Sequence, residues 1–331
     1  MSTNFRSLGS QGPKAFPLAL GCAGMSGTLG QSKDDSESLS TIHEAIEHGV
    51  NLLDTADFYG GGHNELLIGK AIQGRRDKVL ISAKFGGLRS PEGAFVGLDT
   101  RPEAVKNFLT YTLTRLGVDH IDIYRPARLD PQVLIEDTIG AISDLVKAGY
   151  VRHIGLSEVG PETICRAHAV HPICDLQIEY SLMSRNPEQE IFPLLKELGI
   201  AITAYGVLSH GLLSGTTRQT DKSDLRAHLP RFKGENLERN QKLVEAFGEI
   251  AQEKQVTNTQ LAIAWVLAKG SSIIPVVGSR QRGQLQEALG ALEITLSSDE
   301  MTRIERTVPA EAVAGARYNE NLMKMLDSER R

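Results

Sequence analysis

The chain has 331 residues, of which 40% are hydrophobic and 23% are charged, and its formal net charge at pH 7 is −5. Asp and Glu (41) outnumber Lys and Arg (36) and no basic cluster offsets them, which argues against a protein that binds nucleic acid or anionic membranes. The length and composition are typical of a globular protein with a large core, and we expect one domain over 1–331.

Short β-branched runs alternate with amphipathic helical patterns along the chain, as repeated βα units do. Many of the helical patterns end at a glycine, among them those at Gly49, Gly117, Gly149 and Gly199. The pattern predicts eight strands, which in chain order span residues 17–21, 50–55, 78–84, 120–125, 152–157, 175–180, 200–205 and 272–278.

Eight strands, each followed by a helix, predict a closed (β/α)8 TIM barrel with long loops at its C-terminal mouth. An open doubly wound sheet would fit the same alternation, but it should show the pattern GxGxxG after its first strand. Residues 20–30 read LGCAGMSGTLG and do not match that pattern. The long polar segment 216–240 predicts an excursion loop at the barrel mouth.

The N-terminal residues 1–12 contain no apolar signal core, and no segment approaches the ~18 consecutive apolar residues of a membrane span. Three cysteines, Cys22, Cys165 and Cys174, lack CxxC spacing, which argues against a disulfide framework and a zinc site. We therefore expect a cytoplasmic protein with reduced thiols and no metal, and the sequence leaves its oligomeric state open.

Three polar residues stand where functional groups lie in such a barrel, at the carboxyl ends of strands and on the loops that follow. Asp54 closes the second strand, Tyr59 lies on the next loop, and Lys84 closes the third strand. A buried ammonium needs a counter-ion, and Asp54 is the neighbouring acid. We expect Lys84 to lower the pKa of the Tyr59 phenol from ~10, so that the phenol can exchange a proton with a carbonyl oxygen.

Six motifs follow one another along the chain: NLLDTADFYGGGHNELLIGKAI (51–72), KVLISAKFG (78–86), GYVRHIGLSEV (149–159), LQIEYSLMSR (176–185), ITAYGVLSHGLLSG (202–215) and IIPVVGSRQRGQLQEAL (273–289). Together these motifs resemble the aldo-keto reductase family, and the resemblance covers roughly residues 5–310. It implies a barrel that binds NADPH without a Rossmann motif and reduces aldehydes or ketones, as in bacterial pyridoxal reductase-like and xenobiotic-ketone-reducing members.

The resemblance also implies roles for single residues. Tyr59 is the general acid, Lys84 lowers its pKa, and Asp54 is the lysine's counter-ion. Further implied cofactor contacts are Ser157 and Gln177 at the nicotinamide carboxamide, Tyr205 on the nicotinamide ring, Gly206, Leu208, Gly211 and Leu213 around the pyrophosphate, and Gly278, Ser279, Arg280, Gln284 and Glu287 at the adenosine end. Met25 is a candidate substrate contact.

One departure from the family concerns substrate placement. The family has a histidine in a run like D-L-Y-x-x-H-R-x-D-P, whereas residues 122–131 read DIYRPARLDP, with Ala127 in its place. Arg125 shares the strand parity of Ala127 and should point into the barrel. It either reaches the substrate carbonyl or forms a buried ion pair, with Glu179 or Asp54 compensating its charge.

Milder departures affect the cofactor. Glu158 replaces an amide that usually follows the strand-five serine, Gln284 replaces an arginine, and Ala288 replaces an asparagine. Arg280 and Arg282 favour NADPH over NADH. The variable segments 84–97, 216–234 and 313–331 indicate a roomy mouth for a bulky ketone, such as a xenobiotic or mycotoxin-like compound.

Two other classes of function fit less well. A cofactor-binding regulatory or sensor protein, resembling the potassium-channel β-subunits of the same fold, would explain the lost histidine. A metal-dependent barrel hydrolase would need clustered His and Asp ligands, which the sequence does not show.

Overall fold

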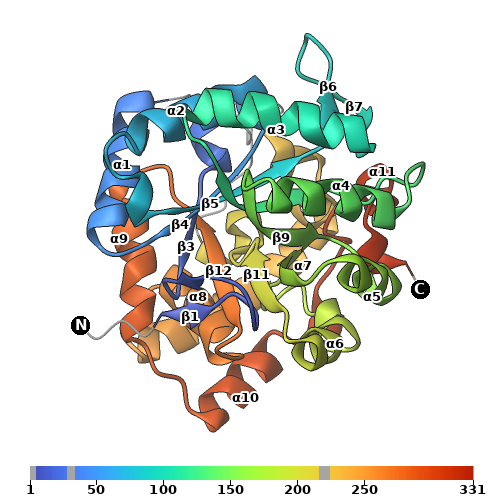
Figure 1. Cartoon of the computed structure of the whole chain (residues 1–331). Helices are drawn as coiled ribbons and strands as arrows, with labels where there is room; N and C mark the ends of the chain where they lie inside the picture. The colour runs from blue at the N-terminus through green and yellow to red at the C-terminus, as the bar shows by residue number, and fades with distance from the viewer. Residues whose placement is uncertain (1–4, 28–33, 216–223, 331) are drawn as a thin grey trace.

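The structure, a computed structural model, describes residues 5–27, 34–215 and 224–330. Eight parallel strands lie at its centre and form a closed barrel, in which β9 pairs with β10 to complete the ring (Figure 1). The barrel confirms the predicted (β/α)8 fold and excludes the open sheet. Its strands are β3 (Ala19–Gly21), β4 (Leu52–Ala56), β5 (Leu80–Phe85), β8 (Ile121–Pro126), β9 (Val151–Ser157), β10 (Ile173–Glu179), β11 (Ala201–Tyr205) and β12 (Ile273–Gly278).

Helices surround the barrel, and at least one follows each of its strands (Figure 1). After β11 the chain forms two long helices before it returns to the sheet. The helices are α1 (Asp35–Glu47), α2 (His63–Ala71), α3 (Pro102–Leu116), α4 (Ile135–Lys147), α5 (Pro161–Val170), α6 (Ile191–Leu198), α7 (Gly234–Glu253), α8 (Asn258–Ala268), α9 (Arg282–Gly290), α10 (Ser298–Thr307) and α11 (Glu320–Met323).

The residue patterns explain these elements. β4 and β10 are buried at every position, because helices cover the outer face of a parallel barrel and side chains fill its interior. Helix α4 buries Ile135, Ile139 and Ile142, one stripe at helical spacing, against the strands. Helices α3 and α6 end at Gly117 and Gly199, whose φ angles of 65° and 66° are left-handed and cost glycine little.

A short hairpin closes the N-terminal end of the barrel. Its strands are β1 (Arg6–Ser7) and β2 (Lys14–Ala15), which the sequence analysis did not predict. Leu8 and Ala15 pack into an apolar cluster with barrel residues that include Leu52 and Ile123. This apolar cluster fills the N-terminal end of the barrel interior. The polar residues of the strands lie farther toward the C-terminal mouth.

The loops at the mouth contain regular structure. The variable segment 84–97 begins in β5 and continues into the hairpin of β6 (Gly87–Arg89) and β7 (Phe95–Leu98), which projects from the barrel beyond α3 (Figure 1). Of the predicted excursion 216–240, residues 216–223 lie outside the described part of the chain, and α7 begins already at Gly234. Among the described residues, no helix has both the length and the apolar character needed to span a membrane.

Candidate active site

Asp54 and Lys84 form an ion pair inside the barrel near its C-terminal end. Adjacent strands β4 and β5 pair Asp54 with Ser82 and Ala56 with Lys84, so the two charged residues are diagonal neighbours. The Lys84 Nζ donates to both carboxylate oxygens of Asp54, at 2.6 Å to Oδ2, and both side chains are nearly fully buried. A buried charge alone would cost several kcal/mol, so each residue stabilises the other in its charged form.

Gln177 on β10 reaches the same carboxylate from across the barrel. Its Nε2 lies 2.9 Å from Asp54 Oδ2 and 3.3 Å from Oδ1. Ser157, at the end of β9, is the register partner of Gln177. The structure thus brings together Asp54 and Lys84, which the sequence analysis expected to pair, and adds Gln177 to them. Gln177 and Ser157 were assigned to the nicotinamide carboxamide, and here the Gln177 amide donates to Asp54.

Tyr59 is placed by the turn that follows β4. It begins the 3-10 segment Tyr59–Gly62, in which Gly60 and Gly61 have φ angles of 59° and 65°. A Cβ on Gly60 would lie 2.8 Å from the Cβ of Ser26, so the turn requires glycine both for its backbone conformation and for its packing. The turn holds the Tyr59 ring with its centroid 5.1 Å from the Lys84 Nζ.

The pKa of Tyr59 differs from the expectation. Removal of the phenol from water raises the pKa of Tyr59 above its ordinary value of 10.0, and the nearby charge of Lys84 opposes this only in part. Asp54 also raises the pKa of Tyr59, because its negative charge offsets that of Lys84. The predicted lowering was therefore wrong in its net sign, and the Tyr59 phenol stays protonated at neutral pH.

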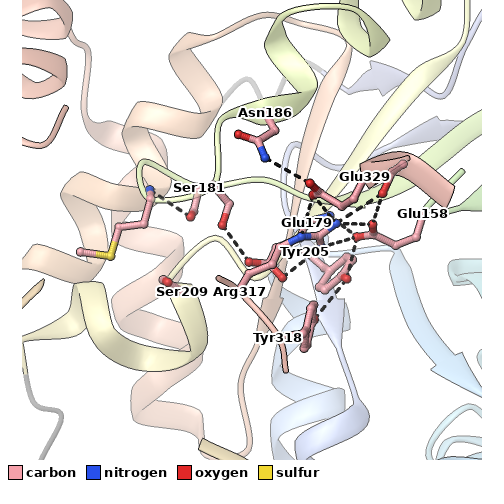
Figure 2. A network of polar contacts seen from close by, with 12 residues as sticks. Glu158, Glu179, Ser181, Asn186, Tyr205, Ser209, Arg317, Tyr318 and Glu329 are labelled. Atoms are coloured by element: carbon pink, nitrogen blue, oxygen red, sulfur yellow. Dashed lines mark hydrogen bonds and ion pairs between the residues drawn. The ribbon is translucent and has the colours of Figure 1, made fainter. Parts of the chain in front are cut away.

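Tyr205 belongs to a polar network that joins the mouth to the C-terminal segment (Figure 2). Its hydroxyl donates to Glu158 Oε1 at 2.7 Å, and Arg317 donates to both oxygens of Glu158 at 2.9 and 2.6 Å. Arg317 also contacts Glu179 and Glu329, at 3.3 and 2.9 Å. Burial alone would raise the pKa of Glu158, but Arg317 and its other partners lower it to about 2.

Arg125 lies fully buried inside the barrel. Its Nη2 is 2.9 Å from Asp175 Oδ2 and 2.9 Å from Ser82 Oγ, and its Nη1 donates to Thr203 at 3.2 Å. Of the two readings left open by the sequence, this arrangement favours the buried ion pair. The expected partners were wrong, because the counter-ion is Asp175 rather than Glu179 or Asp54.

The segments assigned to the cofactor lie at the ends of β11 and β12. After β11, the 3-10 segment Ser209–Ser214 has left-handed φ angles at Ser209, His210 and Gly211. Ser279, directly after β12, is 1% exposed, and its Oγ is a buried group that has no hydrogen-bond partner in the described part of the chain.

The remaining predicted residues at this end have contacts of their own. The Arg280 side chain lies along Gly24, where an added Cβ would be 3.1 Å from Arg280 Cγ. The backbone N–H of Arg280 donates to Gln284 Oε1 at 2.9 Å, and Glu287 is half-buried on α9. Arg282 instead pairs with Glu37 at 3.1 Å.

Met25, the candidate substrate contact, lies next to the turn that carries Tyr59. Met25 is buried, at 2% exposure, in the 3-10 segment Ala23–Ser26 that packs against the Tyr59 turn. Arg128 and Arg317 were not predicted as site residues. The arginine after the histidine position in the motif could have pointed to Arg128, whereas no local pattern brings Arg317 back to the mouth.

Among the residues that the structure describes, no three His, Cys, Asp or Glu side chains lie close enough to hold a metal ion. The fold and the site together define a barrel that carries a tyrosine beside a buried lysine, aspartate and glutamine cluster at its C-terminal end.

Comparisons with known proteins agree with this description. A sequence profile described as "Aldo/keto reductase family" matches residues 17–308. The probable aldo-keto reductase 1 of Glycine max is 41% identical over 319 residues, which are 95% of this chain and 92% of that protein.

Solved structures show the same likeness. The glycerol dehydrogenase AKR11B4 from Gluconobacter oxydans superimposes with a TM-score of 0.84 at 25% identity, covering 100% of this chain and 98% of that one. The holo form of the aldo-keto reductase AKR11C1 from Bacillus halodurans has a TM-score of 0.79 at 26% identity, covering 96% and 99%. The chain belongs to the aldo-keto reductase family, and it is an oxidoreductase that uses NADP(H).

Proposed function

We propose that the protein reduces the carbonyl group of an aldehyde or ketone to an alcohol with NADPH, and that Tyr59 is the general acid. The main support is the position of the Tyr59 ring, 5.1 Å from a Lys84 ammonium that donates to Asp54, whose carboxylate also accepts from Gln177. A proton donor beside a fixed positive charge can protonate a carbonyl oxygen as negative charge develops on it.

The residues at the ends of β11 and β12 fit the expected cofactor. Among the residues that the structure describes, the Ser279 Oγ has no hydrogen-bond partner, and such a buried polar atom is costly unless a ligand supplies one. The half-buried Arg280 side chain lies beside it and offers a guanidinium for a phosphate. We propose that Ser279 and Arg280 bind the 2′-phosphate, which gives a preference for NADPH over NADH.

The proposed cofactor contacts extend from this end toward Tyr59. We assign Tyr205 to the nicotinamide ring, and the turn with Gly206, Leu208, Gly211 and Leu213 to the pyrophosphate. Ser157 and Gln177 are assigned to the carboxamide, and Gly278, Gln284 and Glu287 to the adenosine end. When bound, NADPH supplies the hydride that reduces the carbonyl carbon.

The raised pKa of Tyr59 supports its role as an acid. Because the pKa of Tyr59 lies above its ordinary value, the phenol still carries its proton when a substrate arrives. Lys84 favours the phenolate that remains after proton transfer, and Asp54 fixes the lysine in place. Tyr59 thus keeps its proton before the reaction, and the positive charge of Lys84 stabilises the phenolate that forms when the proton leaves.

The elements around the mouth support a large substrate. The β6–β7 hairpin follows β5 at the mouth, and the C-terminal segment docks at the barrel through Arg317 and through Asp327, whose carboxylate accepts from the Gly160 N–H at 2.8 Å. We propose a bulky ketone, of xenobiotic or mycotoxin-like type, as the substrate.

The test is to mix the purified protein with NADPH and a panel of aldehydes and ketones and to follow the loss of NADPH absorbance. We expect turnover with the wild type and a loss of at least about 100-fold in kcat for Tyr59→Phe, the usual size of a general-acid contribution. Tyr111→Phe is the matched control, because Tyr111 is 55% exposed on α3. Binding of NADPH without turnover of any carbonyl would favour the sensor protein instead.

A further inference from the structure

Arg128 is the second residue after β8, on the strand that pairs with the strand of Lys84. The backbone N–H of Ala127 donates to the carbonyl oxygen of Phe85 at 2.9 Å, so Ala127 is held next to the strand end that carries Lys84. Ala127 is 5% exposed and its methyl group offers no hydrogen-bonding atom there. The first polar side chain after the end of β8 is therefore that of Arg128.

The Arg128 guanidinium turns back over this strand end. Its Nη1 donates to the Ala127 carbonyl oxygen at 2.6 Å and lies 3.4 Å from Ser157 Oγ. Ser157 is the register partner of Gln177, and Gln177 donates to Asp54. A short series of neighbours thus places Arg128 at the edge of the Asp54 cluster.

One edge of this guanidinium is unoccupied. The Nε and Nη2 of Arg128 make no hydrogen bond to any residue in the described part of the chain, although the side chain is half-buried. The same edge binds a carboxylate elsewhere in this protein, where Arg166 Nε and Nη2 donate to the two oxygens of Glu136 at 2.7 and 2.8 Å. An open Nε/Nη2 edge is a preformed donor pair for two oxygens of a ligand.

The charge of Arg128 acts on the groups of the site. Burial raises the pKa of Tyr59, and the positive charges of Lys84 and Arg128 both act to lower it. Glu158 also attracts Arg128, but its two oxygens already accept hydrogen bonds from Arg317, Tyr205 and Ser328. The paired donors of Arg128 are consequently left for a bound molecule.

We propose that Arg128 binds the substrate through its Nε/Nη2 edge, and that the enzyme therefore prefers carbonyl compounds with a second oxygen on the adjacent carbon. This inference rests on the proposed carbonyl reduction. α-Diketones and α-hydroxyketones present two oxygens to the two donors, whereas a simple ketone leaves one donor unpaired in a partly desolvated site. Arg128 would then both position the carbonyl and select the substrate class.

The test compares 2,3-butanedione with 2-butanone, which share a carbon skeleton, in the wild type and in Arg128→Lys. Lysine keeps the charge but loses the paired donors. We expect the ratio of kcat/KM for the diketone to that for the monoketone to fall by about 10- to 100-fold, as for a lost charged hydrogen bond. Arg166→Lys, at a surface ion pair, is the control and should leave the ratio unchanged.

Two further readouts separate this inference from other roles of Arg128. The dissociation constant for NADPH, measured by fluorescence, should stay within about twofold of the wild-type value. A rise in that constant, or an equal loss of kcat/KM for both ketones, would show that Arg128 serves the cofactor or the fold and would overturn the inference.

Failure of the proposed function gives a different result. If the wild type binds NADPH but turns over neither ketone nor any other carbonyl, both the inference and the reduction are wrong. If Arg128→Lys does not fold, as judged by thermal unfolding, Arg128→Met replaces it in the same comparison, with the same expected fall in the ratio.

Discussion

At the scale of single residues, the fully buried Arg125 and Asp175 pair shows what a local pattern can and cannot predict. Strand parity placed Arg125 inside the barrel correctly. Its partner depends on Gly155 of β9, where an added Cβ would lie 2.6 Å from Asp175 Oδ1 and 3.1 Å from Arg125 Cζ. Because Gly155 has no side chain, there is room for this pair across the barrel. The alternation of residues along one strand cannot predict such a contact between strands.

A double-mutant cycle tests the structural role of this pair. Arg125→Leu should lower the free energy of unfolding by about 3 to 5 kcal/mol, because it leaves Asp175 charged and unpaired at 0% exposure. Replacing both residues by leucine should cost less than the sum of the single changes. Urea unfolding gives the values. If Arg125→Leu lost turnover while its stability stayed unchanged, Arg125 would belong to the substrate site instead.

Tyr59 shows the limit of sequence reasoning about charge. The sequence places a phenol near an ammonium, and the structure keeps them close. The sign of the pKa shift, however, depends on how much water is removed and on where Asp54 directs its charge. Both depend on the assembled barrel, so the neighbours of Tyr59 were predictable and the net shift was not.

At the scale of elements, the regular parts of the barrel were predictable because each strand repeats one pattern. The strands predicted at 152–157 and 200–205 correspond to Val151–Ser157 and Ala201–Tyr205. The hairpins β1–β2 and β6–β7 were not predicted, because strands of two to four residues are too short to show alternation.

The C-terminal segment is a second element that the sequence did not place. Arg317 reaches Glu158 at the end of β9, 159 residues earlier in the chain, and Ser328 donates to the same carboxylate at 2.6 Å. This contact joins the last residues of the chain to the mouth of the barrel. The contact depends on burial and on opposite charges. Its residues are too far apart in the sequence for a local motif to predict it.

The pH dependence of stability tests this junction. Because the folded pKa of Glu158 is lowered from 4.5 to about 2, Glu158 stabilises the fold fully above about pH 5, and this contribution is lost as the pH falls toward 2. Glu158→Gln should therefore lower the free energy of unfolding at pH 7 by roughly 3 kcal/mol and weaken its decline between pH 5 and 3. Urea unfolding at pH 7, 5 and 3 measures both effects.

Glu300→Gln is the matched control for this prediction. The pKa of Glu300 is also lowered to about 2, chiefly by Lys254, but its side chain is 39% exposed, and water screens such a pair. We expect a smaller loss of stability from that change. Parallel losses for the wild type and Glu158→Gln between pH 5 and 3 would contradict the account of the junction.

At the scale of the whole molecule, the barrel separates an apolar end from a polar one. The β1–β2 hairpin and its apolar cluster fill the N-terminal end, and the Arg125 and Asp175 pair lies farther along the interior. The Asp54 and Lys84 pair and the Tyr59 turn lie at the C-terminal end. The close-packed apolar end fixes the strands, and the C-terminal end of the same strands can therefore hold a buried ammonium beside a phenol.

The most direct test of the central claim follows the hydride itself. Reduction of a carbonyl with NADPH deuterated at the transferred position of C4 should give an alcohol with one deuterium on the carbinol carbon, detected by mass spectrometry. Tyr59→Phe should bind the same cofactor yet form at least about 100-fold less of this product. An undeuterated alcohol, or equal yields from the wild type and Tyr59→Phe, would contradict the proposal that this barrel reduces carbonyls with Tyr59 as the acid.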